Sequence, residues 1–147
     1  MEKYYTPELE EFHVGFEFEY NKGGDNWVKH TSGNHDFRDG IIDVGVGETD
    51  DALYNPFHMG ISEREFRVKH LDRSDIESFG WVSGESYGMS CYLRTDENGV
   101  AIIDGYQLDF HSWELVEIYQ ESTSDLKFSG TIKNKSELKK LLKQLGI

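Results

Sequence analysis

The sequence predicts an α+β fold: a mostly antiparallel sheet with a short middle helix and an amphipathic helix near the C-terminus. Several short segments alternate apolar and polar residues, turn-forming clusters separate them, and leucines recur at helical spacing near the end of the chain. Many strands with few helices favour an antiparallel sheet over alternating β–α units. The 147 residues fit a single domain, residues 1–147, without an internal repeat or interdomain linker.

The first expected element is a strand over residues 12–20. Apolar side chains at every second position fall on one face of this strand, and Glu17 and Glu19 fall on the other. The turn-forming cluster at 21–26 and the residues that follow it predict a return strand over 27–31, and therefore a hairpin. Residues 32–62 are rich in turn-forming residues, and a loop of this length in a compact domain is either functional or mobile.

The middle of the chain predicts a strand over residues 65–70 and then a short helix over 73–79. Asp72 has the character of an N-cap, with Asp75 three residues later, and Gly80 provides a stop. Alternation and turn residues after this helix predict further strands over residues 88–95, 100–103, 106–111, 115–119 and 126–132.

The last expected element is a helix that begins after Asn134 or Ser136 as its N-cap and ends at Gly146. Its leucines stand at i, i+3, i+4 and i+7, which places them in one apolar stripe that we expect to pack on the sheet. The stripe consists of Leu138, Leu141, Leu142 and Leu145.

Charge restricts the classes of partner. The chain has 28 acidic and 15 basic residues, a net charge of −13. Residues 133–143 hold five lysines and one glutamate, a balance of +4, so the rest of the chain carries −17. Such a surface repels phosphate backbones and anionic lipids, which predicts no direct nucleic-acid binding and no membrane binding. The absence of an apolar signal-like N-terminus and the single cysteine, Cys91, favour a cytoplasmic location.

The acidic composition has two interpretations: it keeps the protein soluble, or it provides electrostatic complementarity to a basic partner. For the second, the candidate contacts are Glu10, Glu11, Glu17, Glu19, Asp50 and Asp51. Trp81 and Trp113, with several tyrosines, either add an aromatic contact patch or complete the core.

Three segments carry a resemblance to known sequences. Residues 4–19, 67–81 and 132–145 resemble the opening, the middle and the end of small uncharacterised proteins encoded by Bacteroidetes genomes and their phages. Because no activity is assigned to those proteins, the resemblance identifies no functional residue. It implies a cytosolic setting, on a phage or mobile element, in which small acidic proteins act by binding a component of the host.

These observations favour a non-enzymatic acidic binding protein that contacts a basic host protein, such as a nucleic-acid-binding or defence protein, and needs no cofactor. One alternative is a small metal-dependent hydrolase of phosphoesters or nucleotides at His30, His35 and Asp36, because two imidazoles and a carboxylate can hold a first-row metal. Another alternative is a protein that sequesters a small ligand with the loop at 32–62. No residue is assigned a catalytic role.

Overall fold

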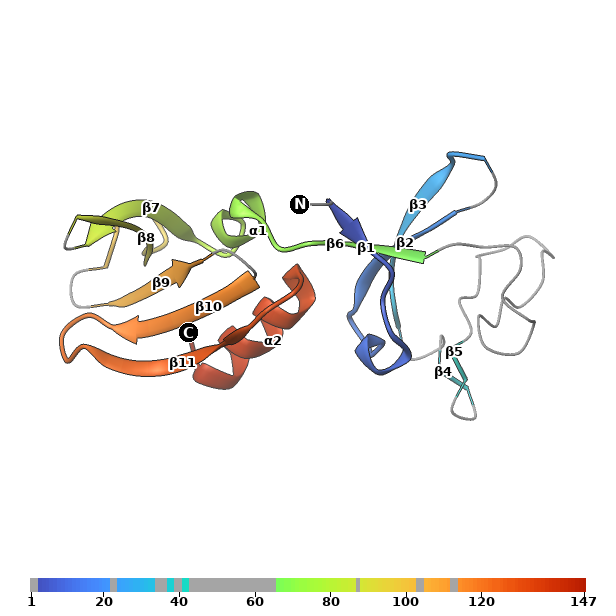
Figure 1. Cartoon of the computed structure of the whole chain (residues 1–147). Coiled ribbons are helices and arrows are strands. Elements are labelled where there is room, and N and C mark those ends of the chain that lie inside the picture. The colour runs from blue at the N-terminus through green and yellow to red at the C-terminus, as the bar shows by residue number, and fades with distance from the viewer. Residues whose placement is uncertain are drawn as a thin grey trace. The chain divides into compact units, whose positions relative to one another are not determined.

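The computed structural model describes residues 3–21, 24–33, 37–38, 41–42, 66–86, 88–102, 105–111 and 114–147. The chain forms two compact units, residues 1–69 and residues 70–147. The described strands pair in antiparallel sheets, and both described α-helices belong to the second unit (Figure 1). The predicted α+β fold is therefore confirmed, whereas the prediction of a single domain stays a prediction.

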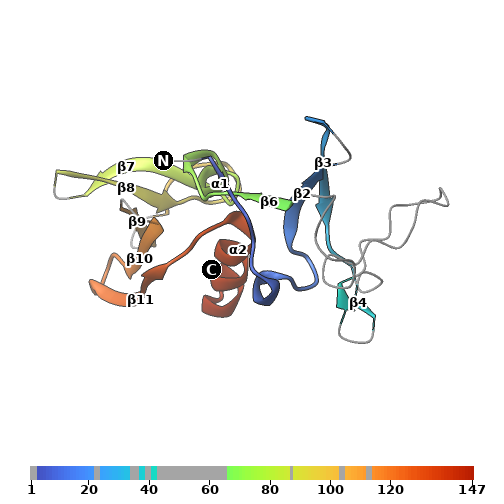
Figure 2. The same ribbon diagram turned by 45° about the vertical axis from the view of Figure 1, so that its right-hand side comes forward.

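The first unit contains a four-stranded sheet with the strand order β1-β6-β2-β3. Its strands are β1 (Tyr4–Tyr5), β2 (Glu17–Asn21), β3 (Trp27–Thr31) and β6 (Phe66–Lys69). The predicted hairpin is present, because β2 and β3 pair from Glu17 opposite Thr31 to Asn21 opposite Trp27, and the two strands lie side by side in both views (Figure 1, Figure 2). A 3-10 turn, η1 (Leu9–Glu11), precedes β2, and a separate two-stranded ladder joins β4 (Phe37–Arg38) and β5 (Ile41–Ile42). The other residues of the predicted 32–62 loop, apart from Ser32 and Gly33, lie outside the described residues.

The predicted start of the first long strand was wrong, because β2 begins at Glu17 instead of residue 12. Gly15 has a φ of +86°, a left-handed conformation that interrupts an extended strand and favours glycine. The Ser32 hydroxyl holds the bend that follows, where it accepts a hydrogen bond of 3.1 Å from the Phe16 backbone amide. The predicted alternation is nevertheless correct, since Phe18 and Tyr20 are buried and Glu17 is exposed.

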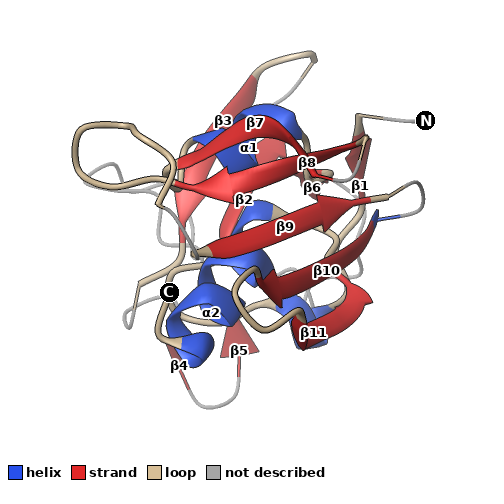
Figure 3. Cartoon of the chain, turned by 90° about the vertical axis from the view of Figure 1, so that its left-hand side faces the viewer, coloured by secondary structure: helices blue, strands red, loops and turns tan. Residues whose placement is uncertain are grey.

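The second unit is an antiparallel meander with the strand order β11-β10-β9-β8-β7, and Figure 3 shows β7 to β10 side by side in this order. Its strands are β7 (Trp81–Ser86), β8 (Met89–Arg94), β9 (Tyr106–Phe110), β10 (Leu115–Gln120) and β11 (Asp125–Thr131). Helix α1 (Arg73–Glu77) precedes this meander, and helix α2 (Lys135–Leu145) follows it.

The predicted strands over 88–95, 106–111, 115–119 and 126–132 are confirmed as β8 to β11, with small shifts at their ends. Among the described residues of 100–103, no strand forms, and Ala101 makes an isolated bridge with Thr95. The sequence patterns did not predict β1 or β7, and the run of β7 from Ser83 to Ser86 is polar or glycine. As an edge strand, β7 depends on its pairing with β8 more than on a buried apolar face of its own.

Both helices begin as their sequences predict. In α1, the Asp72 side chain accepts a hydrogen bond from the Asp75 amide, and the Asp75 side chain accepts one from the Asp72 amide, which completes a capping box. In α2, the Asn134 side chain accepts a hydrogen bond of 3.0 Å from the Glu137 amide, so Asn134 is the N-cap. Gly146 ends α2 with a φ of +72°.

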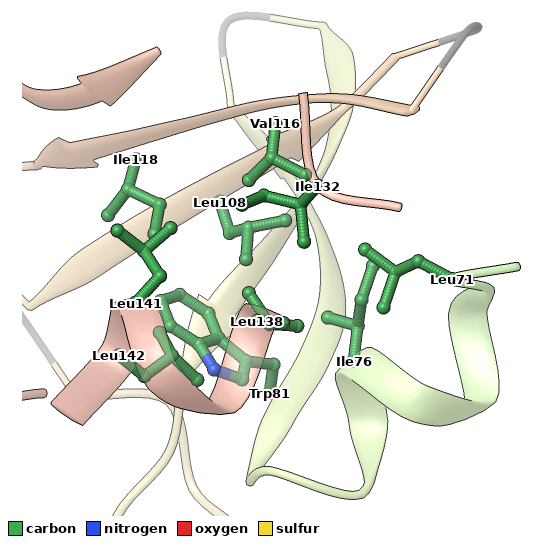
Figure 4. Close-up of a cluster of buried hydrophobic side chains, with 10 residues drawn as sticks. All are labelled: Leu71, Ile76, Trp81, Leu108, Val116, Ile118, Ile132, Leu138, Leu141 and Leu142. Atoms are coloured by element: carbon green, nitrogen blue, oxygen red, sulfur yellow. The ribbon is translucent and has the colours of Figure 1, made fainter. Parts of the chain in front are cut away.

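The core of the second unit lies between one face of the sheet and the two helices. Figure 4 shows side chains of β9 and β10 on the side of α2, with the Trp81 indole beside the α2 leucines. Its buried members are Leu71, Ile76, Trp81, Leu108, Val116, Ile118, Ile132, Leu138, Leu141 and Leu142. Because strand side chains alternate between faces, the residues between these positions in β9 and β10 point away from the helices. Among the described residues, no helix combines the length and the apolar character that crossing a bilayer requires.

Candidate binding face on the five-stranded sheet

On β9, β10 and β11, the sheet face opposite the helices carries polar side chains, two of which are carboxylates. Asp109 on β9 stands opposite Glu117 on β10, and Glu117 stands opposite Ser129 on β11. Gln107 and Tyr119 form the next cross-strand pair on the same face. We call these five residues, together with His111 at the end of β9, the open face.

Charge is segregated across the second unit. The exposed lysines at positions 139, 140 and 143 lie on α2, the helix that packs on the core side of the sheet. The open face carries Asp109 and Glu117 instead. The unit therefore has an anionic side and a cationic side, which orients it in the field of a charged partner.

A pocket of about 510 Å³ lies beside the open face. Its described lining consists of Glu85, Ser86, Met89, Gln107, Asp109, Tyr119, Glu121 and Ser124. Three of these residues are carboxylates and none is basic. Met89 is 65% exposed and adds an apolar wall, so the pocket combines negative charge with apolar and aromatic surface.

Hydrogen bonds fix the carboxylates of the open face. Glu117 accepts hydrogen bonds of 3.0 Å from the Tyr119 hydroxyl and of 3.0 Å from the Ser129 hydroxyl. His111 Nε2 lies 3.2 Å from Glu117 Oε2, the same oxygen that accepts the hydrogen bond from Tyr119. The Gln107 side-chain amide donates a hydrogen bond of 2.7 Å to Asp109. Asp109, His111 and Glu117 each offer a metal-ligand atom, and these atoms lie within 4.8 Å of one another.

These contacts shift the acidity of three groups. The Tyr119 hydroxyl, followed by Ser129 and His111, holds the pKa of Glu117 below its ordinary value, and Glu117 in turn raises the pKa of Tyr119. Burial raises the pKa of the Cys91 thiol, and the nearby carboxylates of Asp109 and Glu121 raise it further. The lowered pKa of Glu117 keeps the open face anionic at neutral pH, and the raised pKa of Cys91 favours the neutral thiol over the thiolate.

The lowered pKa of Glu117 makes the Tyr119 contact sensitive to acid. Glu117 ionises more readily in the folded protein than in the unfolded chain, so its ionised form stabilises the fold. This stabilisation is complete at pH values above the unfolded pKa, and it is lost as the pH falls through the folded pKa. Tyr119→Phe removes the main cause of the shift. We expect the difference in unfolding free energy between the wild type and Tyr119→Phe to be constant above pH 5 and to shrink below the ordinary glutamate value of 4.5. Urea unfolding from about pH 7 to pH 3 measures this difference; a difference that grows on acidification would contradict the assignment.

The predicted contact residues of the first unit do not form one free surface. Glu10 and Glu17 are exposed. The Glu11 carboxylate accepts hydrogen bonds of 2.8 Å from the Tyr5 hydroxyl and of 2.7 Å from the Glu8 amide. Glu19 forms an ion pair of 2.7 Å with Arg67, and the Arg67 guanidinium is also held between two aromatic rings. The carboxylates of Glu11 and Glu19 therefore already have hydrogen-bond or ion-pair partners within the unit.

For Trp81, the structure decides between the two interpretations. Its indole is 1% exposed in the core, so it completes the core and does not form a contact patch.

His30 lies on β3 with its ring 5.3 Å from that of Phe18. The other predicted partner-binding and metal residues, Asp50, Asp51, Trp113, His35 and Asp36, lie outside the described residues. The metal site at His30, His35 and Asp36 therefore stays a prediction.

The acidic residues of the pocket and of the open face were not among the predicted site residues; they are Glu85, Asp109, Glu117 and Glu121. A signal for part of this set was present, because residues 107, 109 and 111 alternate with the apolar residues of the predicted strand over 106–111. The register that sets Glu117 opposite Asp109 is a tertiary property.

No family model, curated protein or solved structure matches this chain. The resemblance to Bacteroidetes and phage proteins stays a prediction.

Proposed function

We propose that this protein is a non-enzymatic binding protein that holds a cationic segment of a protein partner in the pocket beside the open face. The observation that carries the proposal is the composition of the pocket, whose described lining has three carboxylates and no basic residue. Two of them, Glu85 and Glu121, have no ion-pair partner among the described residues. Their charge is therefore available to a ligand.

The other pocket residues suit a lysine or arginine side chain. The long side chains of these residues have an apolar stem and a charged end, and each part needs a different surface. Met89 and the Tyr119 ring offer contact to the stem and to the cation, while Glu85, Asp109 and Glu121 offer acceptors for the charged group. A cationic side chain would therefore gain specific contacts with the pocket lining in addition to the attraction of the net negative charge.

The anionic open face and the cationic helix α2 also favour one orientation of approach. A basic partner is attracted to the side of the pocket and repelled by the exposed lysines on α2. A basic protein of the host, such as a nucleic-acid-binding or defence protein, is the class of partner that this charge pattern and the sequence resemblance support. The hydrolase and small-ligand alternatives stay predictions, because most of the residues that they require lie outside the described residues.

Calorimetric titration with two peptides of equal length tests the proposal. One peptide carries several lysines and arginines, and the other has glutamine at the same positions. We expect the cationic peptide alone to bind, and we expect its affinity to fall as the salt concentration rises from about 50 to 200 mM, because salt screens exposed charges. Equal affinity for both peptides, or no binding of the cationic peptide at low salt, would reject the proposal.

A further inference from the structure

We infer that Asp109, His111 and Glu117 form a binding site for a divalent first-row transition-metal ion such as Zn²⁺. Asp109 lies on β9, and His111 directly follows the strand, where its backbone amide still donates to the Leu115 carbonyl over 2.9 Å, so the two side chains lie on the same face. Glu117 stands directly opposite Asp109 on β10. The topology thus brings one imidazole and two carboxylates together on adjacent strands. The site shares Asp109 with the pocket, but zinc binding can be measured without any peptide.

The spacing of the ligand atoms fits a small ion. Zinc bonds to nitrogen and oxygen of about 2.0–2.2 Å place neighbouring ligand atoms of a tetrahedral site about 3.3–3.6 Å apart. His111 Nε2 and Glu117 Oε2 are 3.2 Å apart, so these two atoms already have nearly the separation of a pair of ligands. The candidate atom of Asp109 lies within 4.8 Å of both.

Groups outside the three ligands hold the carboxylates in place. The Tyr119 and Ser129 hydroxyls donate to the two oxygens of Glu117, each over 3.0 Å, and the Gln107 amide donates to Asp109 over 2.7 Å. Hydrogen-bonded carboxylates supported in this way are typical of metal sites, where the supporting groups orient the ligands. The ligands also lie on strands whose opposite face is fixed in the core by Leu108 and Val116, both of which are fully buried.

The donor set selects the kind of ion. An imidazole with two carboxylates suits Zn²⁺ and its first-row neighbours, whereas Mg²⁺ and Ca²⁺ prefer oxygen ligands alone. Among these divalent ions, affinity for nitrogen and oxygen ligands is higher for Zn²⁺ than for Mn²⁺. Three protein ligands leave one tetrahedral position for water or for a side chain of a partner.

Calorimetric titration of chelator-treated full-length protein with zinc sulfate, without any peptide, tests the site. We expect one equivalent of zinc to bind, and magnesium to give no binding heat under the same conditions. His111→Gln is expected to weaken zinc binding by at least roughly 100-fold, since even the loss of a supporting group costs about 10- to 100-fold. Glu117→Gln, which keeps the side-chain size, is expected to act in the same direction. Tyr119→Phe, which removes only a positioning group, is expected to weaken binding by about 10-fold.

His30→Gln is the matched control, because it removes an imidazole from the first unit and belongs to the metal site that the sequence predicts. We expect this variant to bind zinc like the wild type, with circular dichroism confirming that every variant is folded. Absence of stoichiometric zinc binding in the wild type would overturn the inference. So would binding that survives both His111→Gln and Glu117→Gln, and binding lost in His30→Gln but kept in His111→Gln would move the site to the first unit. None of these results depends on whether a peptide binds.

Discussion

Replacement of Trp81 by alanine is expected to lower the free energy of unfolding by about 3–5 kcal/mol, the usual cost of removing a large buried aromatic side chain. The indole is 1% exposed and belongs to the core cluster that joins β7, β9, β10 and both helices (Figure 4). Its removal leaves a cavity between the sheet and α2 that the surrounding leucines fill only in part. Urea unfolding followed by circular dichroism measures the loss.

Trp81→Phe is the informative companion variant. The Trp81 Nε1 atom is buried without a hydrogen-bond partner among the described residues, a state that itself costs about 1–3 kcal/mol. Phenylalanine removes this buried donor while it keeps much of the apolar volume, so we expect it to cost less than about 2 kcal/mol. If alanine cost no more than phenylalanine, Trp81 would not be the centre of this core.

Reversal of two charges at the pocket is expected to lower the affinity for a cationic peptide by roughly 100-fold, about 2.7 kcal/mol of binding free energy. Glu85→Lys with Glu121→Lys places two cations where a cationic side chain would bind, so attraction becomes repulsion. We also expect the salt dependence of any remaining binding to decrease, because fewer opposite charges face the peptide. Calorimetry across a salt series measures both effects.

The matched control is the double variant Glu10→Lys with Glu17→Lys. Both positions are exposed in the first unit, and each double variant changes the net charge by +4, from −13 to −9. If binding depends on the pocket, the control keeps most of the affinity of the wild type. Equal losses in the two double variants would show that net charge alone drives binding.

Local sequence patterns predicted the elements that local interactions determine. The α2 leucine stripe predicted the buried face of the helix, and Asp72 and Asn134 predicted the two N-caps. Alternation predicted β2 with its buried Phe18 and Tyr20, and the turn-forming cluster at 21–26 predicted the return strand β3. The pattern failed over residues 12–16, because it does not encode the positive φ of Gly15 or the distant Ser32 hydroxyl that supports the bend.

The acidic site was less predictable, because it depends on register and on internal pairing. Composition does not distinguish Glu19, which is neutralised by Arg67, from Glu121, which lines a pocket. Likewise, Asp109 and Glu117 are neighbours only because β9 pairs with β10 in this register. In the sequence, each of them is an ordinary polar residue of a strand. Trp81 shows the converse, since an aromatic residue at the start of a strand whose last four residues are polar or glycine lies at the centre of the core.

The most direct measurement is the change in backbone amide chemical shifts when the ¹⁵N-labelled protein is titrated with the lysine- and arginine-rich peptide at low salt. If the pocket binds the cation, the largest changes fall at Glu85, Asp109 and Glu121 and at their neighbours on the open face, and they disappear as salt is added. Changes centred on Glu10 and Glu17, with the pocket residues unaffected, would contradict the proposal and assign the contact to the first unit.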